Sequence, residues 1–305
     1  MTIKFKQTTM KTSLRILTAA TLLISAIALT TACKKDSSSS SSGSTTNNSA
    51  AANLSANGAT SDNAFDDALN LAVQTGYANN LSSIVGQKSG SSTLGYKFCA
   101  TVTASTDGGH FPDTVKVDFG ATPGCTGNAD GITRSGSITY IFSGKLSAPG
   151  TTISATFNNY VVNGYQLGGT YSISNTSTQT AISFTTAVTS GTITYPNDTS
   201  YTFSGNKVSS LLIPPSNILD PTTFVFNVTG GYTISNTTTG ETLTANVTTP
   251  LERKETCAHV DKGIVSFKYT ATNISVNGTL DYGDGTCDDS ALITIGTFTK
   301  TVTLP

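Results

Sequence analysis

Four aspartates, Asp281, Asp284, Asp288 and Asp289, crowd into one short stretch near the end of the 305-residue chain. Carboxylate oxygens are ligands that Ca²⁺ prefers, and the glycines between these aspartates let the backbone turn around an ion. Their spacing differs from that of the helix-loop-helix calcium loop. We therefore weigh a calcium site against a tight hairpin in which the carboxylates accept hydrogen bonds from nearby backbone amides.

Other candidates for catalysis are weak. The four aspartates do not suggest glycoside hydrolysis, because that reaction needs two carboxyl groups opposed across a groove. The chain has two histidines, His110 and His259. Cys257, His259 and Asp261 resemble a zinc corner, but a disulfide-bonded cysteine is neither a thiolate ligand nor a nucleophile. Motifs such as Gly-x-Ser-x-Gly and His-Glu-x-x-His do not occur. The sequence favours a protein without enzymatic activity, with a hydrolase as an alternative.

Tyrosines spread through the predicted strands and offer a second kind of chemistry, because aromatic rings stack on sugars. The chain has no tryptophan, however, and tyrosine also fits cross-strand and core positions. A glycan-binding surface is therefore an alternative to a structural role. The tyrosines in question are Tyr140, Tyr160, Tyr165, Tyr171, Tyr195, Tyr201, Tyr232, Tyr269 and Tyr282.

The N-terminal segment, which ends at a cysteine, predicts where the protein is located. Residues 1–32 carry four basic residues, no acid, and an apolar run from Ile16 to Leu29 that is too short for a convincing membrane span. The segment Leu29-Thr-Thr-Ala-Cys33 resembles a bacterial lipoprotein signal. That resemblance implies that the leader 1–32 is removed, that Cys33 is lipidated, and that acyl chains anchor the protein to a membrane.

Four further cysteines, Cys99, Cys125, Cys257 and Cys287, make an even number in an exported chain and predict two disulfides. We favour Cys99–Cys125 with Cys257–Cys287, each closing a short loop. Cys99–Cys257 with Cys125–Cys287 is an alternative pairing that would join the two ends of the domain.

The net charge of the chain argues against nucleic acid as a partner. Removal of residues 1–32 would leave 13 Lys and Arg against 18 Asp and Glu, a net charge of −5. No basic patch for nucleic acid is expected. Only 11% of residues are charged, against roughly 25% in ordinary soluble domains. Threonine, serine and asparagine replace them, which suits an exported β protein.

Four segments follow from composition and periodicity. Residues 1–32 form the leader, and 33–60, rich in serine, threonine and asparagine, predict a disordered tether. Residues 61–95 contain one short helix, because Phe65, Leu69 and Val73 recur at helical spacing. Residues 96–305 form the β domain.

Period-two alternation, as in Ile138, Tyr140 and Phe142, predicts strands with one buried face. Turn residues such as Asn163-Gly164 punctuate the pattern and indicate ten to twelve strands. We expect an all-β antiparallel meander, folded as a β-sandwich or as a curved open-barrel-like sheet, with one short N-terminal helix.

Two internal repeats indicate two related halves, 96–195 and 196–305. Gly168-Gly-Thr-Tyr-Ser-Ile-Ser-Asn175 is matched by Gly230-Gly-Tyr-Thr-Ile-Ser-Asn236. Val117-Asp-Phe-Gly120, followed by Cys125, is matched by Leu280-Asp-Tyr-Gly283, followed by Cys287.

The Asp-Phe-Gly…Cys segment resembles a family of Bacteroidetes lipoproteins. In that family it is followed by Phe-x-Asn-Tyr-x-Val-Asn-Gly, here residues 157–164, and by Pro-Leu-x-Arg, here residues 250–253. A final Leu-Asp-Tyr-Gly-Asp-Gly-x-Cys-Asp matches residues 280–288. The resemblance covers most of 97–305 and implies an envelope location and an all-β fold, without an activity to transfer.

Together these features predict an outer-membrane lipoprotein, on the periplasmic face or the cell surface, with a non-catalytic structural or binding domain. The alternative is a surface accessory that binds a glycan or a protein. No cofactor is expected apart from the calcium ion considered above.

Overall fold

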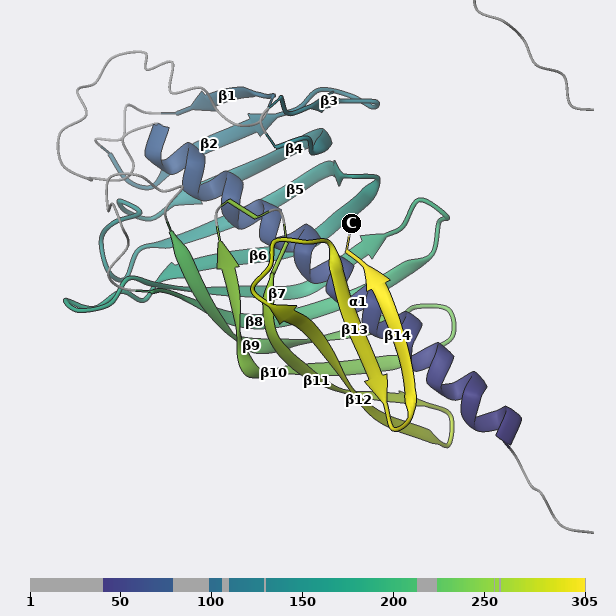
Figure 1. Ribbon diagram of the computed structural model, residues 1–305. Coiled ribbons are helices and arrows are strands. Elements are labelled where there is room, and N and C mark those ends of the chain that lie inside the picture. The colour runs from purple at the N-terminus through teal and green to yellow at the C-terminus, as the bar shows by residue number, and fades with distance from the viewer. Residues whose placement is uncertain are drawn as a thin grey trace, which may run out of the picture. The chain divides into compact units, whose positions relative to one another are not determined.

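The computed structural model describes residues 41–78, 99–105, 110–128, 130–212, 224–254, 256–257 and 259–304. The predicted leader and Cys33 lie outside these residues, as do 34–40 and 79–95. The described part folds into one long helix and one antiparallel sheet (Figure 1). No helix in it has the length and apolar character that crossing a membrane requires.

Within the described residues the sheet has 14 strands, and neighbours in sequence are almost always neighbours in space. Strand β3 pairs only with β4, and β1 and β14 form the two edges, so the sheet does not close. The strands are β1 (Thr101–Ala104), β2 (Asp113–Asp118), β3 (Cys125–Thr126), β4 (Thr133–Phe142), β5 (Thr152–Val162), β6 (Tyr165–Asn175), β7 (Ser183–Thr194), β8 (Ser200–Leu211), β9 (Val225–Asn236), β10 (Thr242–Lys254), β11 (Lys262–Ala271), β12 (Ile274–Asp284), β13 (Ser290–Ile295) and β14 (Phe298–Thr303).

This architecture confirms the all-β antiparallel meander, in its curved open form and as one sheet rather than two packed sheets. The strand number exceeds the ten to twelve expected. Strands β1 and β3 contain four and two residues, which is too short to display a period of two.

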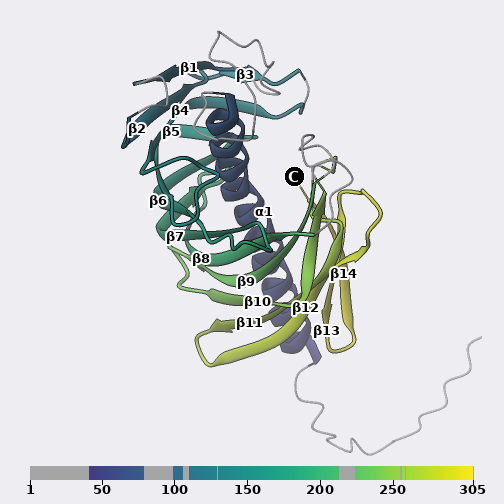
Figure 2. The ribbon, with the colours of Figure 1, turned by 90° about the vertical axis from the view of Figure 1, so that its left-hand side faces the viewer.

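The sheet curves because most of its strands contain a bulge. Register shifts interrupt the pairing of β4 with β5, of β5 with β6, of β6 with β7 and of β7 with β8. Residues with positive φ occupy these shifts, including Gly136, Asn159, Gly169 and Ser190. Because each bulge bends its strand, bulges on neighbouring strands bend the sheet as a whole (Figure 2).

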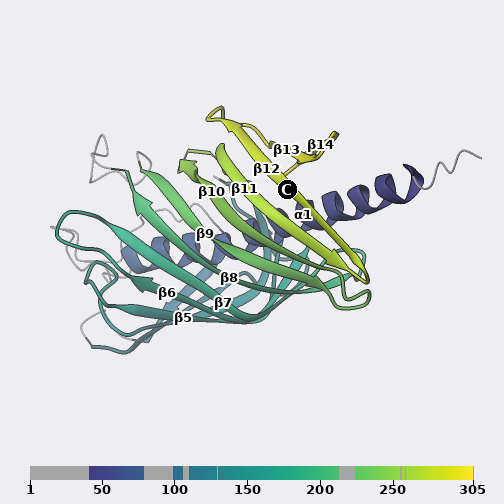
Figure 3. The same cartoon turned by 90° about the horizontal axis from the view of Figure 1, so that it is seen from below.

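The concave side of the sheet holds α1 (Ser41–Ala78), a helix of 38 residues (Figures 1 and 3). Large side chains from both meet in one core: Phe65 of α1 stacks on Phe203 of β8, and Tyr140 and Ile138 of β4 are completely buried. Tyr140 also donates a hydrogen bond to the backbone carbonyl of Ala68 in α1.

The predicted tether is wrong from residue 41 onward, and the helix is long rather than short. Residues 41–60 belong to α1, and small side chains are buried in its segment from residue 51 onward. Ala51, Ala52 and Leu54 are buried there. Gly58 passes so close to Tyr232 of β9 that a Cβ atom would lie 2.7 Å from the ring. Close packing stabilises this segment although its composition is polar.

Candidate functional site

The interface between α1 and the sheet contains a buried ionic layer, made of two clusters. In the first ion cluster Arg134 of β4 forms a bidentate pair with Asp67 of α1, with N–O distances of 2.6 and 2.8 Å. Arg134 also pairs with Asp130 at 2.8 Å, and Tyr160 of β5 donates a hydrogen bond to Asp67. The Arg134 side chain is 2% exposed, so the first ion cluster lies inside the fold.

Burial controls the charges of this cluster. Desolvation alone would lower the pKa of Arg134, but hydrogen bonds and attraction to Asp67 raise it above its ordinary value. Burial and the nearby Asp67 charge raise the pKa of Tyr160 well above 10.0, so that phenol stays a donor. The cluster therefore holds a fixed arrangement of charges rather than a proton that is easily exchanged.

The second ion cluster lies further toward the N-terminal end of α1. Lys207 of β8 pairs with Asp62 at 2.8 Å and with Asp66 at 2.6 Å, and Arg253 of β10 lies 3.9 Å from Asp66. Burial raises the pKa of Asp62 to about 6, against the opposing attraction of Lys207. Close to this cluster, the hydroxyl of Tyr232 is buried and has no hydrogen-bond partner among the described residues.

Composition did not reveal these two clusters. Asp67 and Arg134 are 67 residues apart in sequence, and Lys207 and Asp66 are 141 apart. One signal was available: Asp62, Asp66 and Asp67 fall within the predicted helix, whose other face is apolar. Carboxylates on a helix that packs against a sheet require buried cations, and the strands contain few of these.

Of the four aspartates predicted as calcium ligands, Asp281 and Asp284 lie in the last part of β12, and Asp288 and Asp289 lie just before β13. Asp281 accepts a hydrogen bond from the backbone N–H of Gly283, Asp284 from that of Thr286 and Asp288 from that of Ser290. Hydrogen bonds from Thr286 lower the pKa of Asp284. The structure assigns these three carboxylates to local turns.

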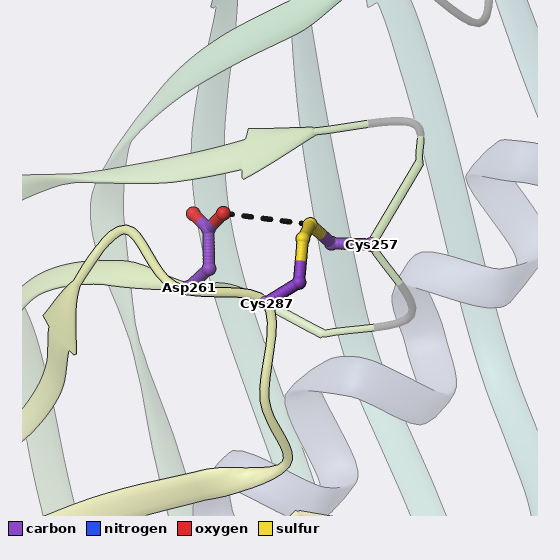
Figure 4. A group of neighbouring side chains, drawn as sticks. All are labelled: Cys257, Asp261 and Cys287. Atoms are coloured by element: carbon purple, nitrogen blue, oxygen red, sulfur yellow. Dashed lines mark hydrogen bonds between the residues drawn. A yellow bond between two sulfur atoms is a disulfide. The ribbon is translucent and has the colours of Figure 1, made fainter.

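These aspartates do not converge on one point. Among the described residues, one group of three His, Cys, Asp or Glu side chains brings its ligand atoms within 4.8 Å of one another: Cys257, Asp261 and Cys287 (Figure 4). None of the four predicted calcium ligands belongs to it, and calcium binding stays an untested prediction. Cys257 and Cys287 form a disulfide, so they offer no thiolate for zinc either.

The cysteines pair as favoured, Cys99 with Cys125 and Cys257 with Cys287, with Cα–Cα distances of 6.0 and 5.6 Å. Each disulfide follows one copy of the Asp-aromatic-Gly repeat. We call residues 117–125 with Cys99 the first corner, and residues 280–287 with Cys257 the second corner.

In the second corner the buried Asp261 lies beside the disulfide, with its Oδ2 atom 3.5 Å from the Sγ of Cys257 (Figure 4). Lys254 pairs with Asp261 at 2.7 Å and donates to the carbonyl of Gly285 at 2.7 Å. Desolvation lowers the pKa of the neighbouring His259, despite the opposing attraction of Asp289 and Asp288. The polar groups of this corner thus hold the disulfide loop in place.

The tyrosines mostly face the core and do not form an exposed stacking surface. Seven of the nine predicted positions are buried, and Tyr165 and Tyr195 are partly buried and in edge contact with one another. A pocket of about 190 Å³ borders the first ion cluster, between Asn63 of α1, Ile132, Tyr165 and His259. The buried tyrosines are Tyr140, Tyr160, Tyr171, Tyr201, Tyr232, Tyr269 and Tyr282.

Compared with protein-family models, with curated proteins and with solved structures, the chain matches none. Its function therefore has to be argued from its own residues.

Proposed function

We propose that the protein is a lipid-anchored component of the bacterial cell envelope, whose β domain acts as a non-catalytic structural or binding module. The anchor is Cys33, which follows an apolar leader and small residues. The membrane is the outer membrane, as the resemblance to Bacteroidetes lipoproteins suggests. The domain is held outside the cytoplasm by this anchor.

One observation carries the exported location. All four cysteines after Cys33 are paired in two disulfides, each between residues 26 or 30 positions apart. Disulfides persist in oxidising compartments and are rare in the cytosol. The pairing leaves Cys33 as the thiol available for a lipid.

The ionic layer supports a non-catalytic role. An active site needs acids, bases or nucleophiles that face a substrate and are not already paired with other groups of the protein. In the described part of the fold, the buried carboxylates Asp62, Asp66 and Asp67 instead pair with cations of the sheet. Because α1 fills the concave side, ligands have to bind on the outer side of the sheet or at its rim.

Fatty-acid labelling in the native type of host tests the anchor. The full-length protein is expressed with an alkyne-tagged palmitate, and label and membrane fraction are followed together. The Cys33→Ala variant is expected to lose the label and to leave the membrane pellet. Cys99→Ala serves as the matched control, because it removes a cysteine without touching the signal. If Cys33→Ala keeps both label and pellet, the proposal is wrong.

A further inference from the structure

The outer side of the sheet carries a groove of about 510 Å³ that crosses β2, β4, β5 and β6. One wall consists of Lys116 and Asp118 of β2 and the turn that follows them. Ser137 of β4, which is 4% exposed, forms the floor. Asn158, Asn159 and Gln166 line the opposite wall. The volume lies within the range of roughly 300–1,000 Å³ typical of small-ligand sites.

The groove is hollow because two neighbouring strands bulge at the same place. Gly136 of β4 has a φ of 74°, and a Cβ atom there would lie 2.1 Å from the carbonyl oxygen of Asn159. Asn159 of β5 has a φ of 49°, and the pairing of β5 with β6 opens between Thr156 and Val161. Left-handed backbone at a residue other than glycine is strained and is found often at functional sites.

The bulge also changes the side-chain pattern. Alternation along a strand would send Asn158 and Asn159 to opposite faces. Instead both are exposed, next to one another, while Tyr160 turns inward to Asp67. The segment 157–164 therefore has two uses: its tyrosine belongs to the first ion cluster, and its asparagines present two amides to the groove.

The facing wall is fixed by the first corner. Asp118 accepts the backbone N–H of Gly120 at 2.9 Å and pairs with Lys116 at 2.8 Å. The Cys99–Cys125 disulfide closes the loop after that turn. A wall that is ordered before binding loses little entropy when a ligand arrives.

The chemistry of the lining selects the ligand. Within the described residues, Asn158, Asn159 and Gln166 have no side-chain hydrogen bond. A primary amide offers two donors and one acceptor group on the same plane, and a sugar hydroxyl both donates and accepts. Lys116 and Asp118 neutralise one another, so the groove has no net charge to attract an ionic ligand.

We propose that this groove binds a neutral oligosaccharide. The inference gives the binding module of the proposed function its ligand class, and it rests on that module rather than on the lipid anchor. Stacking is not part of the recognition, because none of the described residues that line the groove is aromatic. Instead, hydrogen bonds from the side-chain amides of Asn158, Asn159 and Gln166 recognise the sugar.

The test starts with the full-length protein in detergent on an array of neutral glucans, mannans and galactans, beside sulfated and uronic glycans and unrelated peptides. Calorimetry then uses the free hexasaccharide of the best neutral ligand. Asn158→Ala and Gln166→Ala are each expected to weaken binding about fivefold, as the loss of one hydrogen bond does. Asn159→Gly removes an amide but keeps the left-handed backbone.

Asn206→Ala is the matched control, because Asn206 is an exposed amide of β8 that does not line the groove. Binding to this variant should be unchanged. In the wild-type protein, the side-chain NH₂ resonances of Asn158 and Gln166 should shift on titration while that of Asn206 stays in place. A preference for acidic glycans or peptides, no neutral ligand at all, or equal loss in Asn206→Ala would each overturn the proposal. Because the labelling of Cys33 is measured separately, failure here is distinguishable from failure of the anchor.

Discussion

In the first corner the Asp118 carboxylate accepts a hydrogen bond from the backbone N–H of Gly120. In the second corner Asp281 accepts one from Gly283 in the same way, and both N–O distances are 2.9 Å. The two glycines have φ values of 80° and 93°. The aromatic residue between them, Phe119 or Tyr282, is buried in each case. A repeat of a few residues thus reproduces one turn, one inward ring and one disulfide at two distant places in the sheet.

What differs is the cation beside each corner. Arg134 lies opposite Cys125 in the β3–β4 pairing, stacks over Phe119 with its guanidinium carbon 5.7 Å from the ring centre, and pairs with Asp67 of α1. Lys254 is 28% exposed; it pairs with Asp261, beside the disulfide of the second corner, and donates a hydrogen bond to the carbonyl of Gly285 in that corner. The first corner is therefore joined directly to α1, whereas the second is closed on itself. The same local motif fixes a turn, and the surrounding strands decide what the turn is connected to.

The largest contrast should appear when each cation is replaced. Arg134→Met leaves Asp67 charged and buried, so we expect a loss of about 3–5 kcal/mol in the free energy of unfolding. Lys254→Met also leaves a buried carboxylate, Asp261, but Lys254 is itself 28% exposed, so water can reach the space that its ammonium group leaves; we therefore expect a smaller loss of about 1–2 kcal/mol. Urea unfolding followed by circular dichroism measures both.

A double variant separates charge from packing at the first ion cluster. Asp67→Leu combined with Arg134→Met removes both buried charges and should recover part of the loss seen with Arg134→Met alone. Equal losses for Arg134→Met and Lys254→Met would show that the two corners are anchored alike and would contradict the comparison.

The two disulfides should contribute nearly equally. They close loops of similar length, 26 and 30 residues apart, and the loop-entropy relation gives about 3.5 kcal/mol for each. We expect the Cys99→Ser/Cys125→Ser and Cys257→Ser/Cys287→Ser variants to lose this amount in denaturant unfolding under non-reducing conditions. If only one of these variants lost stability, the two corners would differ in the contribution of their disulfides and not merely in their cations. Peptide mapping without reductant identifies the bonds directly.

The second ion cluster predicts a pH dependence. The pKa of Asp62 rises from 3.8 to about 6 on folding, because burial penalises its charge. The folded state therefore binds a proton more tightly than the unfolded state, and the stability that this proton provides is present below pH 3.8 and lost as pH rises through 6. The loss is on the order of 2–3 kcal/mol.

Asp62→Asn isolates that effect, because asparagine does not titrate. The free energy of unfolding of the variant minus that of the wild type should increase between pH 4 and pH 6 and stay level above it. Measuring chemical unfolding at five or six pH values in this window gives the curve. A difference that does not vary with pH would remove Asp62 as the titrating group.

Local pattern predicted the parts of this molecule that depend on neighbours in sequence. Alternation placed Ile138, Tyr140 and Phe142 on a buried face, and the two Asp-aromatic-Gly repeats share one local geometry, in which the Asp carboxylate accepts a hydrogen bond from the backbone N–H two residues on. The favoured cysteine pairing is also confirmed. Each of these features joins residues at most about thirty positions apart.

The remaining features depend on distant contacts. The N-terminal half of α1 contains the buried Ala51 and is stabilised by close packing such as that of Gly58 against Tyr232, which comes much later in the chain. Asp67 and Arg134 look like ordinary surface charges until the sheet has curved around the helix. The groove depends on bulges at Gly136 and Asn159, which become neighbours only through the pairing of β4 with β5. A reading of composition and period has no access to such contacts.

The smallest expected loss of stability comes from the feature that the two corners share, a glycine in the left-handed region. Gly120→Ala and Gly283→Ala each force a Cβ atom into the left-handed region, which costs about 1–2 kcal/mol. Neither Cβ would collide with a described residue: none of them lies within 4 Å at Gly120, and the nearest atom at Gly283, the carbonyl oxygen of Asp261, is 3.8 Å away. Backbone strain is then the only cost, and the two losses should agree within the error of denaturant unfolding. A clearly larger loss at Gly283 would show that the closed second corner is also the more rigid one, so that its turn could not relax around the added methyl group.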